Sequence, residues 1–154
     1  FSRTNGFHMT NSPFKIRDAS DDDIAGIKQL IQPYVQQRKL LDRTDAELHT
    51  LIANGFAAMI DDQLVGFAAV EIYSRKMAEI QCLAVSPTAQ GIGIGKQLIL
   101  KCIDRAKEKN VVEVLAITAS EAIFMDCGFD FSLPDQKKAM FFQTGNRDRP
   151  SPGE

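Results

Sequence analysis

The chain has 154 residues and a formal charge of −2 at neutral pH. Its length suits one domain, and its 44% hydrophobic and 25% charged residues exclude disordered, collagen-like and coiled-coil classes. Eighteen basic residues do not outnumber twenty acidic ones, so no nucleic-acid partner is expected. No apolar run approaches the roughly 20 residues of a membrane helix, so no membrane partner is expected either.

Cysteine and histidine are scarce. Cys82, Cys102 and Cys127 are far apart and odd in number, which disfavours a disulfide framework and favours a reducing, cytoplasmic location. His8 and His49 match no recognised metal spacing with these cysteines. We therefore expect neither a metal site nor a histidine-based triad.

The two ends differ in composition from the rest of the chain. Residues 1–12 are small, polar and aperiodic, and we expect a disordered segment or a cloning remnant there. Residues 146–154 are rich in proline and charge, which predicts a flexible tail. The folded domain is expected over 13–145.

Hydrophobic periodicity predicts the elements in chain order. A short strand at 14–17 precedes a helix that Ser20 caps, and Thr44 caps a second, short helix. The later elements are a hairpin of strands at 56–60 and 64–73, a strand at 77–85, a long helix after Gly95, a buried strand at 111–117, a helix at 120–127, and closing strands at 129–133 and 139–143. This order predicts a mixed sheet with helices packed on it, in the α/β (α+β) class.

The strand at 77–85 is expected to alternate regularly between two faces. One face would carry Ile80, Cys82 and Ala84, and the other Glu79, Gln81, Leu83 and Val85.

Three alternate glycines, Gly91, Gly93 and Gly95, follow the strand that ends at Val85 and lead into the long helix. Glycine lets the backbone approach a ligand because no Cβ intervenes, and the first N–H groups of a helix lack internal partners. With the helix dipole they form a phosphate site, and Lys96 adds a positive charge. The spacing fits neither the P-loop nor the dinucleotide-binding motif. A tight helix start without a ligand is the structural alternative.

Gln90-x-x-Gly93-x-Gly95 resembles the Q/R-x-x-G-x-G/A motif of the GNAT N-acetyltransferases, and the resemblance extends over roughly 14–143. It implies a GNAT-like, mostly antiparallel sheet flanked by helices, with acetyl-CoA bound where two strands splay apart. In this family the loop amides bind the pyrophosphate and the preceding strand bonds the pantetheine arm. The acetyl-CoA contacts that the resemblance implies are Cys82, Leu83, Ala84, Val85, Gln90, Gly91, Ile92, Gly93, Ile94, Gly95 and Lys96.

Three further segments are similar to the acetyltransferase domain of N-acetylglutamate synthases. They are Glu79-Ile80-Gln81-Cys82-Leu83-Ala84-Val85, the stretch from Thr118 through Ser120 to Phe129, and Leu133-Pro134-x-x-Lys137-Lys138. This similarity implies that Glu79 is the general base and Ser120 the general acid. A dicarboxylate acceptor requires cations, and Arg43 and Lys137 are our candidates for them, with Cys82 as a further substrate contact.

Each of these residues also has a purely structural interpretation. Glu79 can be a solvated or paired carboxylate, Ser120 a helix N-cap, and Cys82 a small buried hydrophobe. Two positions depart from the family pattern. Phe124 stands where many GNAT proteins have a tyrosine acid, and Asp42 stands where the synthases have an arginine, with Arg43 next to it.

The sequence therefore predicts an acetyl-CoA-dependent N-acetyltransferase. Its leading acceptor is the α-amino group of a small amino acid such as glutamate. Two alternatives stay open: a GNAT enzyme for another amine (a polyamine, a drug or a protein N-terminus), and a catalytically silent CoA-binding module. GNAT proteins are often dimers, so the resemblance also leaves a homodimer open.

Overall fold

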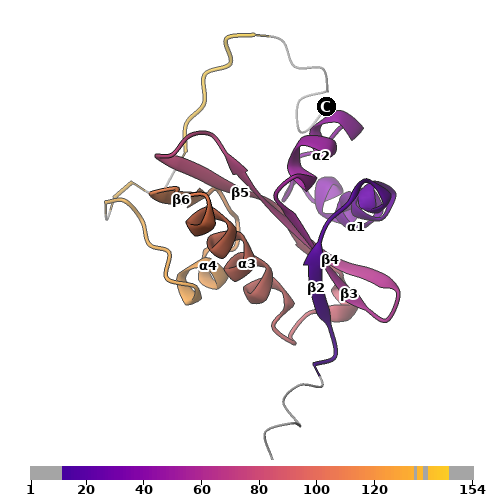
Figure 1. Ribbon diagram of the computed structural model, residues 1–154. Helices are drawn as coiled ribbons and strands as arrows, with labels where there is room; N and C mark the ends of the chain where they lie inside the picture. The colour runs from indigo at the N-terminus through magenta and orange to yellow at the C-terminus, as the bar shows by residue number, and fades with distance from the viewer. Residues whose placement is uncertain (1–11, 134, 137–138, 146–154) are drawn as a thin grey trace, which may run out of the picture.

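The computed structural model describes residues 12–133, 135–136 and 139–145, and Figure 1 shows a single sheet with helices on both faces. The expectations for 1–11, for Lys137 and for 146–154 lie outside the described residues. The elements are β2 (Lys15–Asp18), the 3-10 turn η2 (Asp21–Asp23), α1 (Ile24–Gln36), α2 (Asp45–Ile52), β3 (Gly55–Ile60), β4 (Gln63–Ile72), β5 (Met77–Val85), the 3-10 turn η3 (Pro87–Ala89), α3 (Ile94–Glu108), β6 (Glu113–Ala116) and α4 (Glu121–Asp126).

The sheet is mixed and follows the chain order β2-β3-β4-β5-β6. Every neighbouring pair is antiparallel except β5 and β6, which are parallel and connected through α3. Helices α1 and α2 cover one face, and α3 and α4 cover the other (Figure 1). The predicted class, a mostly antiparallel sheet flanked by helices, is confirmed.

Local sequence signals set the first two helices. Thr44 caps α2 as predicted: its hydroxyl accepts from the Glu47 N–H at 3.1 Å, and the Glu47 carboxylate accepts from the Thr44 N–H at 2.9 Å. Before α1, the Asp23 carboxylate accepts from the Ser20 N–H at 2.8 Å and pairs with Arg17 at 2.8 Å. These contacts fix where the chain leaves the edge strand and enters the helices.

Two apolar clusters hold the layers together. One stripe of α3 is fully buried against one face of the sheet and consists of Ile94, Leu98, Cys102 and Ala106, broadened by Ile99. On the other face, α1 and α2 pack on Phe67 through Ile27, Leu30, Ile31, Leu48 and Leu51. Gly66 lets α3 come close, because a Cβ there would lie 2.9 Å from Ile94.

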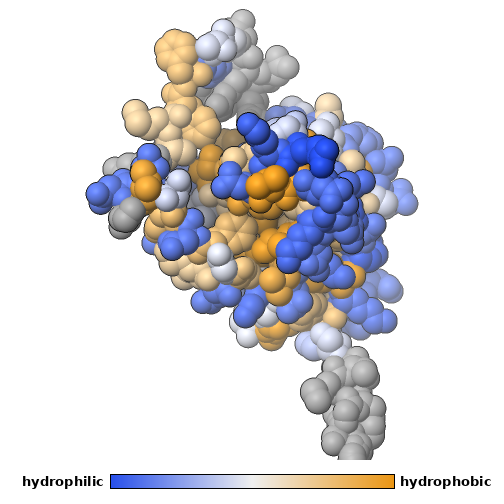
Figure 2. Space-filling model, turned by 60° about the vertical axis from the view of Figure 1, so that its left-hand side comes forward, coloured by the Kyte–Doolittle hydropathy of each residue, from blue (hydrophilic) through white to orange (hydrophobic). Residues whose placement is uncertain are grey.

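The predicted closing strands are wrong. Residues 129–133 and 139–143 are described, and neither forms a strand. The alternation at 129–133 and the apolar run at 139–142 favour strand conformation, but a strand also needs a partner edge. Met140, Phe141 and Phe142 are 93%, 75% and 88% exposed, and Figure 2 shows apolar side chains standing away from the body of the molecule beside the grey residues.

The strand predicted at 111–117 is shorter and less buried than expected. In the described part of the chain β6 pairs only with β5, so its other edge is open. Val112 and Ile117, which flank β6, are therefore 78% and 53% exposed.

The predicted alternation of β5 is wrong after Gln81. Ile80 packs in the cluster below α3, whereas Cys82 and Ala84 pack in the cluster below α1. The cause is a β-bulge: Phe67 pairs with Ala84 but Ala69 pairs with Gln81, so β5 carries one extra residue. Cys82 accommodates it with a φ of 62°, in the left-handed region.

Candidate active site

A cleft of about 1450 Å³ opens where β5 and β6 diverge. Their pairing ends at Ile80 and Ala116, so the remainder of β5 presents an unpaired edge to the cleft. Ten of the eleven predicted acetyl-CoA contacts line this cleft, and Ile92, which is 44% exposed, does not. Backbone groups on such an edge can bond an extended ligand as a further strand would.

The glycine loop forms one end of the cleft. Gly91 and Gly93 have φ values of 84° and 94°, and a Cβ on either would meet open space. No group in the described part of the chain accepts a hydrogen bond from the N–H groups of residues 91–96. Bare amides at the start of a 15-residue helix, with Lys96 on its first turn, suit a pyrophosphate group. This end of the cleft therefore fits coenzyme A.

Gly95 has a different role from the other two glycines. Its Cβ would lie 2.7 Å from Ile123 Cδ1, so this position keeps α3 close to α4. The loop thus contains two glycines that expose backbone and one that allows helix packing.

Tyr34 on α1 holds the start of the loop. Its hydroxyl donates to the carbonyl of Val85, the last residue of β5, and accepts from Gln90 Nε2 at 2.9 Å. The Gln90 side chain therefore bonds the protein itself, and the loop is tied to both β5 and α1.

The other end of the cleft carries a network of polar side chains. Arg43, in the loop between α1 and α2, donates from Nη1 to Gln81 Oε1 at 2.8 Å. Gln81 Nε2 in turn donates to Glu71 and, at 2.9 Å, to the Tyr73 hydroxyl. The Tyr73 hydroxyl donates to Glu79 Oε1 at 2.6 Å. The candidate base is thus linked to a cation through two neutral side chains.

Arg43 has an unused donor in the cleft. Its Nε is buried and has no hydrogen-bond partner among the described residues. A buried guanidinium N–H without a partner costs free energy, which an incoming acceptor such as a carboxylate would recover. Sequence analysis proposed Arg43 for the acceptor site, and the structure places it in the cleft beside Gln81.

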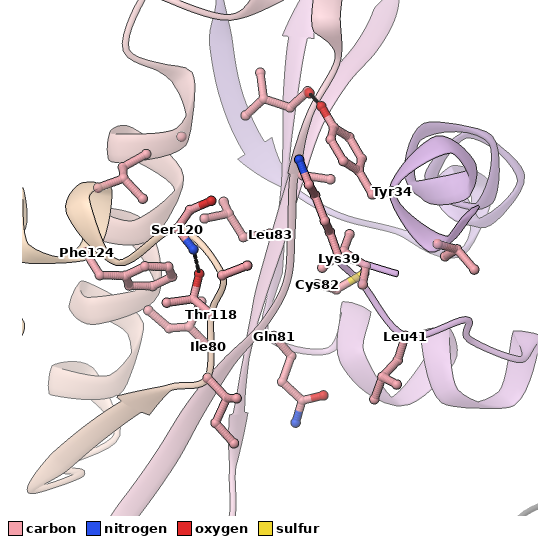
Figure 3. A pocket seen from close by; sticks show the side chains of 18 of the residues that line it. Tyr34, Lys39, Leu41, Ile80, Gln81, Cys82, Leu83, Thr118, Ser120 and Phe124 are labelled. Atoms are coloured by element: carbon pink, nitrogen blue, oxygen red, sulfur yellow. Dashed lines mark hydrogen bonds between the residues drawn. The ribbon is translucent and has the colours of Figure 1, made fainter. Parts of the chain in front are cut away.

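Ser120 lies across the cleft from this network. It occupies the N-cap position of α4, but its side chain makes no capping hydrogen bond, and only its N–H bonds Thr118 Oγ1, at 2.9 Å. Figure 3 shows Ser120 and Leu83 on one side of β5 and Cys82, Lys39 and Leu41 on the other.

Phe124 cannot replace the family's tyrosine acid. It is 5% exposed and packs edge-on against Phe129 with ring centroids 5.2 Å apart. The side chain therefore contributes packing between α4 and the sheet, and it carries no dissociable proton.

Cys82 is a buried thiol beside the acceptor end of the cleft. Burial raises its pKa to about 11, although the nearby Arg43 guanidinium acts in the opposite direction. The thiol is therefore protonated at neutral pH and is a poor nucleophile.

Sequence reasoning missed Tyr34, Glu71, Tyr73 and the bonding role of Gln81. Their contacts depend on the register of β4 and β5 and on the packing of α1, and local motifs do not encode either. The described residues contain no cluster of three or more potential ligands for a metal ion. Among them, no helix is long and apolar enough to cross a membrane.

The model of the acetyltransferase (GNAT) family matches residues 19–129, which is most of the chain. The chain belongs to this family. The amino-acid acetyltransferase of Neisseria meningitidis is 33% identical over 123 residues, covering 79% of this chain and 28% of that relative. This GNAT chain thus spans less than a third of the length of such relatives.

Solved structures of similar proteins also match this chain. N-acetylglutamate synthase from Neisseria gonorrhoeae, complexed with coenzyme A and N-acetyl-glutamate, matches with a TM-score of 0.67 and 32% identity over 73% of this chain and 27% of that one. A Mycobacterium tuberculosis protein in complex with CoA matches with a TM-score of 0.69 and 26% identity over 74% and 70% of the two chains. The chain therefore shares the fold of these proteins, which were solved in complex with coenzyme A.

Proposed function

We propose that the protein transfers the acetyl group of acetyl-CoA to the α-amino group of a small amino acid such as glutamate. The observation that carries this proposal is one cleft with bare loop amides at one end and an unpaired arginine donor at the other. The first feature suits the phosphates of the donor, and the second suits a carboxylate of the acceptor. The unit we assign to this activity is residues 13–145.

The donor would lie along β5. The amides of Gly91 to Lys96 would bind the pyrophosphate, and the free edge of Cys82 to Val85 would bond the pantetheine arm. Tyr34 and Gln90 would hold the loop in place, and Lys96 would add charge. This arrangement directs the thioester toward the point where β5 and β6 separate.

The acceptor would enter from the side of Arg43. Its carboxylate would accept from the buried Nε, while Gln81 fixes the guanidinium by accepting from Nη1. An amine without a carboxylate would leave that donor unsatisfied, which disfavours a polyamine. Lys137 remains a proposed second cation, and it lies outside the described residues.

The chemistry is direct attack of the amine on the thioester. Glu79 would take one proton from the acceptor ammonium, and the amine nitrogen would then bond the acetyl carbon while the C–S bond breaks. Ser120 would give its proton to the departing thiolate, and the second proton lost from nitrogen would replace it. The products are the N-acetyl amino acid, CoA-SH and one proton, and no acyl-cysteine at Cys82 is needed.

Thiol release from acetyl-CoA with a panel of amino acids and other amines tests the proposal. We expect turnover with a carboxylate-bearing acceptor, and Arg43→Met should raise the KM of that acceptor without changing the KM of acetyl-CoA. Turnover only with polyamines, drugs or peptide N-termini would favour another GNAT specificity. Binding of acetyl-CoA, seen by calorimetry, without any turnover would favour a silent CoA-binding module.

A further inference from the structure

Two carboxylates face each other across the outer edge of the acceptor end. Glu71 on β4 and Glu79 on β5 are direct cross-strand partners. Like charges in this position repel, so the pair needs hydrogen-bond donors between them. The Tyr73 hydroxyl and the Gln81 amide supply these donors: Gln81 bonds Glu71, and Tyr73 bonds Glu79 at 2.6 Å.

Arg43 determines the direction of every bond in this network. A guanidinium only donates, so the atom of Gln81 that faces it must be the amide oxygen. The Gln81 amide nitrogen then faces Glu71 and Tyr73 and must donate to both. The Tyr73 oxygen accepts from Gln81, and its own proton is left for Glu79. Tyr73 keeps this proton, because burial and the bond to Glu79 raise the pKa of the phenol.

The network uses only one of the two oxygens of Glu79. Tyr73 donates to Oε1 at 2.6 Å, and Gln81 Nε2 lies 3.4 Å from the same atom. No described residue bonds Oε2. A carboxylate held through one oxygen keeps the other for a proton from outside.

We propose that Tyr73 is a positioning residue for the general base: with Gln81 behind it, it fixes Glu79 through Oε1 and leaves Oε2 for the acceptor's ammonium proton. The proposal rests on the proposed role of Glu79. Tyr73 itself does not line the cleft, so it acts through Glu79 and not on the substrate.

A double-mutant cycle separates positioning from general damage. In Tyr73→Phe we expect kcat to fall on the order of tenfold, because a hydrogen bond to a charged group is lost. Both KM values should stay within about threefold, since the cleft lining is unchanged. In a Glu79→Gln background the same substitution should have no further effect, because no carboxylate is left to hold.

Ser74→Ala is the matched control. Ser74 lies in the same turn and accepts from the Lys76 N–H at 3.0 Å, but it does not bond Glu79. It should leave kcat unchanged. Tyr73→Phe should lower Tm by no more than about 2–4 °C, because Tyr73 is 53% exposed and a hydrogen bond lost there costs about 1 kcal/mol.

The outcomes distinguish the two proposals. If Glu79→Gln slows turnover but Tyr73→Phe does not, or if the two losses multiply, Tyr73 has no positioning role and the base assignment still stands. If Glu79→Gln turns over at the wild-type rate, Glu79 is not the base and the role of Tyr73 is overturned with it.

Discussion

Gly93→Ala tests whether the phosphates lie at the glycine loop, and Gly128→Ala is its matched control. Both glycines have positive φ values, 94° and 96°, and a Cβ on either meets no protein atom within 4 Å. The backbone strain of an alanine should therefore be similar at the two sites, about 1–2 kcal/mol. Only Gly93 lines the cleft, so only there would the methyl group separate the backbone from a ligand.

Two measurements separate the strain from the loss of binding. Each variant should lower Tm by roughly 2–8 °C, because 1 kcal/mol shifts Tm by about 2–4 °C at this size. Calorimetry with CoA should show a Kd about 10–100-fold higher for Gly93→Ala, the equivalent of one lost bond between an amide and a charged phosphate. Gly128→Ala should bind CoA like the wild type. Equal Kd values for both variants and the wild type would place the phosphates elsewhere.

Tyr34→Phe should raise the KM of acetyl-CoA several-fold, since it removes both hydrogen bonds at the start of the loop; steady-state kinetics with an acetyl-pantetheine donor, which lacks the pyrophosphate, should show no such rise. Gly66→Ala should destabilise the protein by about 1–3 kcal/mol in urea unfolding, because its Cβ would lie within 3.1 Å of three side-chain atoms, whereas Gly26→Ala on α1, with its nearest atom at 3.8 Å, should not. Asp23→Asn should lower stability at pH 7. The hydrogen-bonded Arg17 guanidinium holds the pKa of Asp23 below its usual 3.8, so the pair stabilises the fold above that pH and loses its effect as pH falls. Urea unfolding at pH 7 and pH 3 should show a smaller difference between variant and wild type at the lower pH.

Sequence alone predicted most of the fold because its signals are local. Thr44 and Glu47 encode a helix start, and Gly91 and Gly93 encode the turn that leads into α3. The prediction of closing strands was wrong because strand pairing depends on contacts that are not local in the sequence. The apolar run at 139–142 gives a local preference for strand, but a strand forms only where it pairs with a sheet edge, and in the described part of the chain the outer edge of β6 is open.

The candidate site was predictable only in part, because some of its contacts join residues that are distant in the sequence. Glu79 and Ser120 came from motifs, Arg43 stands next to the position where the synthases have an arginine, and all three line one cleft. Tyr34 and Tyr73 belong to no motif. The first contacts Val85 across 51 residues of sequence, and the second meets Glu79 because the register of β4 and β5 sets Glu71 opposite Glu79.

The bulge at Cys82 explains how β5 can contact both the proposed acetyl donor and the proposed acceptor. With regular alternation, Gln81 and Cys82 would lie on opposite faces of β5. The side chains after them would continue the alternation between faces that begins at Met77. The extra residue puts both on the side of α1, next to Arg43, and turns Leu83 toward Ser120 (Figure 3). Cys82 is neither glycine nor asparagine, so nothing in its identity signals a φ of 62°. The strain at this residue is stored where the proposed donor and acceptor would meet, and the surrounding buried contacts of Cys82 hold it there.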